Sequence, residues 1–194
     1  MSDFIETLEL TDELSAVNAI LFSVGEAPIP SLDNVFTDAE AARDLLRQRL
    51  RAVQLMGWTF NTDLNFPLAP DNLGIIYFPA NTLSYKLDDA NLTKRGNRLY
   101  DRANHTYEFT SAVTATELVT LLSFDECPEA LRLFVTIAAG RRFQDRYQGD
   151  QILHKFQATD EVAAWASLQN YEAEVAQYNM LSKSSLVARL KGGR

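Results

Sequence analysis

The sequence has few of the residues that form disulfides, bind metals or cross membranes. Its 194 residues include one cysteine, Cys127, so a disulfide within the chain is excluded. The two histidines, His105 and His154, fall short of the roughly four Cys or His ligands of a closed zinc site. The longest apolar runs, such as residues 131–140, are interrupted and too short to span a bilayer. We therefore expect no metal site, no cofactor and no membrane segment.

Basic residues are also in the minority. The chain has 18 lysines and arginines against 26 acidic residues, which gives a net charge of −8 and a pI of about 4.8. Proteins that grip nucleic acid are usually basic, so this balance disfavours DNA binding, although DNA could pass nearby without being held. The first ten residues are acidic and lack the charged-then-apolar order of a signal peptide, so we expect none.

Apolar residues at spacings of three and four predict four helices. The first opens at Thr11, which has the chemistry of an N-cap, and the second begins with a capping-box pattern at Thr37 and ends at Gly57. The third helix is expected over 128–147 and is apolar nearly all round, which is typical of a central helix. The fourth is expected over 150–178.

Between the second and third predicted helices, apolar and polar residues begin to alternate with a period of two. Trp58 and Phe60 begin an alternation that would place both aromatics, with Leu64, Phe66 and Leu68, on one face of a strand. Prolines and a glycine then separate short apolar runs, which indicates strands joined by turns. These runs are 75–78, 83–87, 99–100, 107–109, 112–115 and 118–124, with 101–106 as a hairpin connection and 116–123 ambiguous between strand and helix.

The predicted fold class is therefore α+β, mainly a helical bundle of about four helices with an antiparallel β-rich insertion between helices 2 and 3. We expect a single domain over residues 1–194, in which 11–57 and 125–178 form the bundle and 58–124 form the insertion. Residues 179–194 turn polar and basic and are expected to be a flexible C-terminal tail.

Short stretches along the chain also carry a resemblance. The first are Glu13–Asn18, Gly25–Pro28 and Gly57–Asn61. Further on come Arg95-Gly96, Tyr100-Asp101-Arg102, Asn104, Phe109, Asp125-Glu126, Pro128-Glu129, Arg141, Phe143, Arg146, Gly149 and Tyr178-Asn179-Met180-Leu181. Over residues 13–181, in this order, the chain resembles the tail tubular protein A family of short-tailed bacteriophages. The resemblance implies a head-to-tail adaptor of the virion tail, assembled in the host cytoplasm. Its expected partners are other copies in a dodecameric ring, the portal, and the nozzle protein (tail tubular protein B), and DNA would pass through the lumen without specific binding.

A ring of identical subunits requires two different complementary patches on one chain. Candidates are the basic stripe Arg43, Arg47 and Arg51 of the second helix and the acidic residues of the fourth. The latter are Asp160, Glu161, Glu172 and Glu174. The alternative for the stripe is a solvated helix face whose arginines pair with Glu40 and Asp44.

Two further sets of residues are candidates for partner binding. The densest positive cluster, around Tyr100, consists of Lys94, Arg95, Arg98 and Arg102. It could dock a partner, or it could be a solvated turn with arginines stacked on tyrosines. The second set is the matched C-terminal signature Tyr178, Asn179, Met180 and Leu181. Trp58 and Phe60 could anchor an interface, but packing at the junction of bundle and insertion is the favoured interpretation.

An enzymatic alternative rests on Asp125, Glu126 and Glu129. Glycoside hydrolysis needs two carboxylates about 5 to 9.5 Å apart, and some phage tail proteins cut glycans at the host surface. With 26 acidic residues, however, neighbouring carboxylates are expected by chance, and acids also suit the start of the third helix. We therefore predict no catalytic residue and keep glycan hydrolysis as the alternative function.

Overall fold

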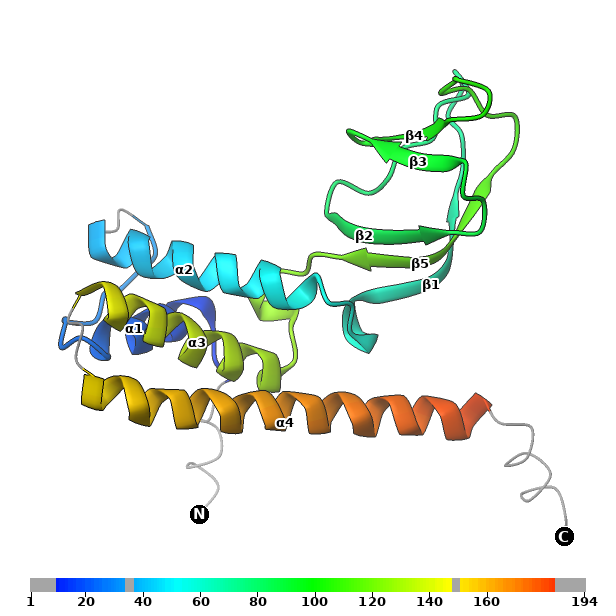
Figure 1. Cartoon of the computed structure of the whole chain (residues 1–194). Coiled ribbons are helices and arrows are strands. Elements are labelled where there is room, and N and C mark those ends of the chain that lie inside the picture. Colours follow the sequence, from blue (N-terminus) through cyan, green and yellow to red (C-terminus); the bar gives the residue numbers. More distant parts are fainter. Residues whose placement is uncertain (1–9, 34–36, 148–150, 184–194) are drawn as a thin grey trace, which may run out of the picture. The chain divides into compact units, whose positions relative to one another are not determined.

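The computed structural model describes residues 10–33, 37–147 and 151–183, including the side chains of residues 158–176 in the last helix. This part of the chain contains four α-helices, with antiparallel strands between the second and third, as Figure 1 shows. The helices are α1 (Glu13–Phe22), α2 (Thr37–Gln54), α3 (Glu129–Tyr147) and α4 (Gln151–Lys183). The predicted α+β class and the position of the insertion are confirmed.

The chain forms two compact units. The first, here called the helical unit, contains the described residues up to Leu50 and those from Ser123 onward, and the second, the β module, is Arg51–Leu122. The last turn of α2 therefore belongs to the β module, which begins seven residues before the predicted boundary at 58 and ends two residues before the one at 124. That the two units form a single domain stays a prediction.

The first helix begins one residue later than predicted. Asp12, not Thr11, is the N-cap: its side chain accepts a hydrogen bond of 2.7 Å from the backbone N–H of Ser15, and the Ser15 hydroxyl accepts one from the N–H of Asp12. This reciprocal capping box satisfies two backbone donors, which a cap at Thr11 would not do. The Thr11 hydroxyl instead donates to Glu129 at the start of α3.

Apolar residues from the four helices fill the core of the helical unit. α3 packs against both α1 and α4 and contributes Leu131, Val135 and Phe143, each of them fully buried. Its apolar character is not wholly buried, because Leu133 is 47% exposed. With 33 residues against 19, α4 is about 20 Å longer than α3, and its C-terminal part continues past it (Figure 1).

The β module contains a three-stranded sheet and a separate hairpin. β1 (Thr62–Leu68), β5 (Val113–Thr120) and β2 (Thr82–Leu87) form the antiparallel sheet in that order. β3 (Leu92–Arg95) pairs with β4 (Arg98–Asp101) in the hairpin. The module core consists of Leu68, Ile76, Phe78, Leu99, Ala115 and Leu118. The strands predicted at 75–78 and 107–109 are only isolated bridges in the described structure, and those at 112–115 and 118–124 merge into β5.

The period-two interpretation of Trp58 and Phe60 is wrong, because residues 59–61 form a 3-10 turn and β1 begins at Thr62. Asn61 causes this turn: its side-chain oxygen accepts from the N–H of Trp58, and its amide donates to the carbonyls of Gln54 and Thr120. Trp58 is 7% exposed and donates its indole N–H to Val53. Leu64 is 57% exposed, although it precedes Phe66 by two residues in the unbroken register of β1 with β5. The packing role of Trp58 is therefore the one observed.

The last helix is longer than predicted. Its backbone continues to Lys183, so residues 179–183, expected in a flexible tail, are helical. Tyr178, Asn179, Met180 and Leu181 lie in this part of α4, and their side chains, like residues 184–194, lie outside the described residues. Among the helices that the structure describes, none combines the length and the hydropathy needed to cross a bilayer.

Candidate partner-binding surfaces

The basic stripe of α2 is largely engaged inside the helical unit. Arg43 donates from Nε and Nη2 to the two carboxylate oxygens of Glu13 at 2.9 and 3.1 Å, and Arg47 Nε donates to the same carboxylate at 3.0 Å. The hydrogen bond from Arg43 is the main cause that lowers the pKa of Glu13. Arg43 and Arg47 therefore form their ion pairs with Glu13 of α1, and neither forms one with Glu40 or Asp44 among the described residues. Arg51, one turn further along, is exposed.

A second carboxylate on α4 is shared by two arginines. Glu161 accepts from Arg49 at 2.9 Å and lies 2.6 Å from Nε of Arg141 on α3. Its side chain is 13% exposed, so Glu161 serves an internal ion triad and is not part of an acidic surface. Glu172 is also partly buried. The acidic face predicted on this helix is thus reduced to Asp160 and Glu174, both of which are exposed.

The β3–β4 hairpin holds its arginines on aromatic rings. The guanidinium carbon of Arg95 lies 3.6 Å from the centre of the Tyr100 ring, and that of Arg98 lies 4.4 Å from the centre of the Tyr107 ring. The centres of the two tyrosine rings are 4.7 Å apart and the rings are tilted by 56°, so the four side chains form one contiguous cluster, here called the arginine–tyrosine stack. Arg95 and Arg98 are exposed and face each other across the hairpin. The arrangement of arginines on tyrosines is the one that the sequence suggested.

The other two cations of the predicted cluster, Lys94 and Arg102, make their contacts within the β module. Lys94 Nζ lies 5.5 Å from the centre of the Phe78 ring and 3.5 Å from the carbonyl oxygen of Thr82. Arg102 donates to the backbone carbonyls of Ala90 and Asn91. The predicted turn at 101–106 is present, closed by reciprocal backbone hydrogen bonds between Asp101 and Thr106. Lys94 and Arg102 thus hold the hairpin in place and offer little to a partner.

One exposed aromatic beside this cluster was missed in the sequence. Tyr77 is 50% exposed and forms an isolated antiparallel bridge with Arg98. Its neighbours Ile76 and Phe78 are buried in the module core. A residue between two buried neighbours in extended backbone points away from them, so alternation in this run was the available signal.

The acidic residues at the start of α3 have structural partners. Glu126 accepts from the backbone N–H and the hydroxyl of Ser123, and this hydroxyl is the main cause that lowers its pKa. Glu129 accepts from the hydroxyl of Thr11 at 2.5 Å. A glycosidase general acid has a raised pKa, which is the opposite of the shift at Glu126. The geometry therefore favours a capping role for Glu126 and a tertiary contact with Thr11 for Glu129 over the acid–base role.

Cys127, between Glu126 and Glu129, is buried. Its thiol donates to the carbonyl of Ser123 at 3.1 Å, and burial raises its pKa to about 12. Such a thiol is a poor nucleophile and a poor metal ligand. In the described part of the chain, no group of three or more His, Cys, Asp or Glu side chains is arranged to hold a metal ion.

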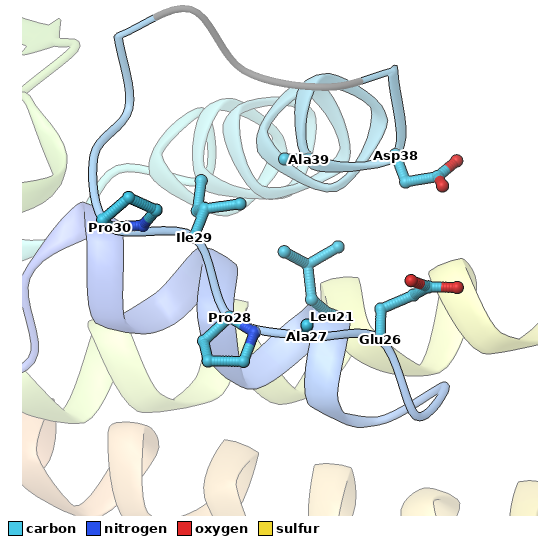
Figure 2. A pocket seen from close by; sticks show the side chains of 8 residues that line it. All are labelled: Leu21, Glu26, Ala27, Pro28, Ile29, Pro30, Asp38 and Ala39. Atoms are coloured by element: carbon cyan, nitrogen blue, oxygen red, sulfur yellow. The ribbon is translucent and has the colours of Figure 1, made fainter.

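A cavity of about 370 Å³ lies where the end of α1 meets the start of α2. Asn18 shapes it by accepting from the N–H of Ile29 and donating to the carbonyl of the same residue. Figure 2 shows the carboxylates of Glu26 and Asp38 on one side of this cavity. The described lining is Leu21, Glu26, Ala27, Pro28, Ile29, Pro30, Asp38 and Ala39. Sequence reasoning missed the cavity because it forms only when two separate helix ends meet.

Comparison with known proteins identifies the family. The family model described as tail tubular protein matches residues 14–178, which is most of the chain and includes the whole β module and most of the helical unit. No curated protein matches the chain. The matched range contains the Glu161 triad, the arginine–tyrosine stack and most of α4. The chain therefore belongs to the tail tubular protein family, structural proteins of the phage tail in the virion.

Proposed function

We propose that the chain is a head-to-tail adaptor, which assembles as a dodecameric ring, joins the portal to the nozzle protein (tail tubular protein B) and lets DNA pass through its lumen. The family match over residues 14–178 carries this proposal. An assembly function also agrees with the roles of the charged side chains described above, which form caps, ion triads and exposed patches. The portal, the nozzle protein and the ring are partners that the sequence resemblance implies.

Two kinds of surface support an assembly role. The exposed carboxylates of α4 and the exposed arginines Arg95 and Arg98 of the hairpin are different charged patches on one chain. Different patches are what a head-to-tail contact between identical subunits requires. Arg51 and the C-terminal signature Tyr178–Leu181 remain candidates for contacts with the portal or the nozzle.

The charge of the chain supports passive passage of DNA. The net charge is −8, and a negative lumen repels the phosphate backbone at short range. Screening limits this repulsion to about 8 Å at physiological salt, so it prevents adhesion without stopping the duplex. We therefore expect no sequence-specific contact between this protein and the genome.

Assembly with the portal tests the proposal. The full chain is mixed with purified portal, and the mass of the products is measured by native mass spectrometry and by electron microscopy. The expected result is a ring of this chain bound to the portal, which then binds the nozzle protein. The portal incubated with the nozzle protein alone is the control. A chain that stays monomeric and unbound in the presence of portal contradicts the adaptor function.

A further inference from the structure

We infer that Arg95 and Arg98 of the β3–β4 hairpin form a receptor for carboxylates on α4 of a second copy of this chain. The inference rests on the proposed assembly function and names the subunit contact within it. The candidate carboxylates are those of Asp160 and Glu174, which lie about 21 Å apart along α4, so the two arginines bind one of them at a time.

The first step is the position of the two arginines in the hairpin. Arg95 and Arg98 are directly opposite in the register of β3 and β4, at the end nearest the turn. Like charges in this position repel each other and destabilise a hairpin. Neither side chain makes a hydrogen bond or an ion pair within the described part of the chain. The repulsion is therefore not relieved by any carboxylate among the described residues.

The second step is how the stack presents the guanidinium groups. Each guanidinium lies on one tyrosine ring, and Tyr100 is only 8% exposed and has its hydroxyl 3.4 Å from Nδ1 of His105. A ring that is fixed by packing also fixes the plane of the cation above it. The N–H edges of the guanidinium stay available, and these edges bind a carboxylate through two parallel hydrogen bonds. Such preorganisation lowers the entropy lost on binding.

The third step is the composition around the pair. Exposed Tyr77 forms a bridge with Arg98 and adds an aromatic side chain next to the two arginines. Tyrosine and arginine are the residue types enriched at the energetically important centres of protein interfaces. The patch defined by Tyr77, Arg95 and Arg98 thus resembles a protein-binding surface rather than a solvated turn.

The fourth step favours a protein over a nucleic acid. Acidic residues lie close to the patch in the chain: Asp88 and Asp89 precede β3, and Asp101 ends β4. The β module as a whole has six lysines and arginines against seven acidic residues. A duplex carries one negative charge per about 1.7 Å and needs an extended basic surface. Two arginines among acids instead suit a single carboxylate group.

The last step is the choice of a second copy as the partner. Residues 1–50 and 123–194 have 12 lysines and arginines against 19 acidic residues, so nearly all the net negative charge of the chain lies there. Asp160 and Glu174 on α4 are exposed and have no ion pair within the described residues. With Ser167 they recur every seven residues, so they lie along one side of the helix. Exposed Ala163 and Ser167 on this side leave room for the hairpin to approach.

Charge reversal on each side, and on both, tests this contact. The variants are R95E/R98E, D160K/E174K and the combination of all four substitutions, with R142E as a control at an exposed arginine elsewhere on α3. Self-association of the full chain, alone and with portal, is measured by sedimentation velocity, and circular dichroism verifies the fold. We expect each double variant to weaken self-association by about tenfold or more, the combined variant to recover most of it, and R142E to change it little.

The possible outcomes separate this contact from the adaptor function. If the wild type assembles and R95E/R98E assembles equally well, the contact is wrong and the adaptor function stands. Weakening by R95E/R98E without an effect of D160K/E174K excludes α4 as the partner and also overturns the inference. If R95E/R98E loses a salt-sensitive affinity for duplex DNA that the wild type has, while its self-association is unchanged, then the patch binds nucleic acid and the inference is overturned. A wild type that does not assemble even with portal overturns both proposals.

Discussion

The helical unit and the β module hold their arginines in different ways. In the helical unit, Arg43 and Arg47 share the carboxylate of Glu13, and Arg49 and Arg141 share that of Glu161. In the β module, Arg95 and Arg98 lie on tyrosine rings. A carboxylate uses up the hydrogen-bonding edge of a guanidinium, whereas a ring occupies only its face. The first arrangement stabilises a fold, and the second keeps the arginine able to bind something else.

This difference has a consequence for charge. Each triad of the helical unit combines two positive charges with one negative charge at partly buried side chains. The fold tolerates this partial burial of charge because each guanidinium has a carboxylate oxygen within 3.0 Å. The stack in the module involves no carboxylate, so the positive charge of both arginines is exposed. The comparison predicts that removing a carboxylate harms the helical unit, whereas removing arginines from the module harms assembly alone.

The largest effect on stability is expected at Glu161. In E161Q, Arg49 and Arg141 lose their shared negative charge while staying about a quarter exposed. Removing one member of a buried ion group costs about 3 to 5 kcal/mol, and partial exposure reduces this to about 2 to 3 kcal/mol. Urea unfolding measures the change in the free energy of unfolding. E174Q, at an exposed acid of the same helix, is the control and is expected to change it by less than about 0.5 kcal/mol.

An E161Q variant as stable as E174Q would contradict the conclusion that carboxylate-bound arginines stabilise the helical unit. It would mean that the triad contributes no net stability, as happens when the desolvation of the charges cancels their attraction.

The effect at Glu13 is expected to be smaller and to depend on pH. The pKa of Glu13 in the folded protein is lowered from its ordinary value of 4.5, mainly by the hydrogen bond from Arg43. A lowered folded pKa means that the carboxylate stabilises the fold above about pH 4.5, and that this contribution disappears as the pH falls through the folded value. E13Q is expected to cost about 1 kcal/mol at pH 7, because Arg47 is more than half exposed.

Thermal unfolding of the wild type and E13Q between pH 3 and pH 7 measures this dependence. The difference in stability is expected to shrink toward zero at the acidic end of the range. A difference that stays constant with pH would show that Glu13 acts through packing and not through its charge.

The positions of the helices could be predicted from residues within each helix. The turn at Trp58–Asn61 and the partners of the α2 arginines could not, because contacts between distant residues determine them. Periodic apolar residues and caps located the ends of α2 and α3 to within three residues, since both signals lie inside the element itself. Trp58 and Phe60 were misplaced because Asn61 reaches carbonyls of Gln54 and Thr120, the latter 59 residues away in the chain. The same limit applied to the α2 stripe, whose carboxylate partner Glu13 lies 30 residues from Arg43.

The candidate site was predictable in part for a related reason. The stacking of arginines on tyrosines could be predicted because Arg95, Arg98, Tyr100 and Tyr107 are close in sequence, within one hairpin and its following loop. Which cations of that cluster stay available could not be predicted, since Lys94 and Arg102 bind carbonyls contributed by other segments. Spacing along the chain identifies a cluster of charge, but the tertiary contacts determine which of its members remain exposed.

The smallest effect on stability is expected at the hairpin, and it gives the sharpest contrast. In R95A/R98A, the loss of two exposed cation–π contacts, each about 0.5 to 1 kcal/mol, is offset by relief of the repulsion between two opposed cations. The free energy of unfolding is expected to change by less than about 1 kcal/mol.

The matched variant R43A/R47A leaves Glu13, 19% exposed, without its two partners and is expected to cost about 1 to 2 kcal/mol. Urea unfolding compares the two variants, and sedimentation velocity compares their self-association, which only R95A/R98A is expected to weaken. A hairpin variant that loses more stability than R43A/R47A would mean that the module arginines hold the fold together, as those of the helical unit do, and the distinction between the two units would then fail.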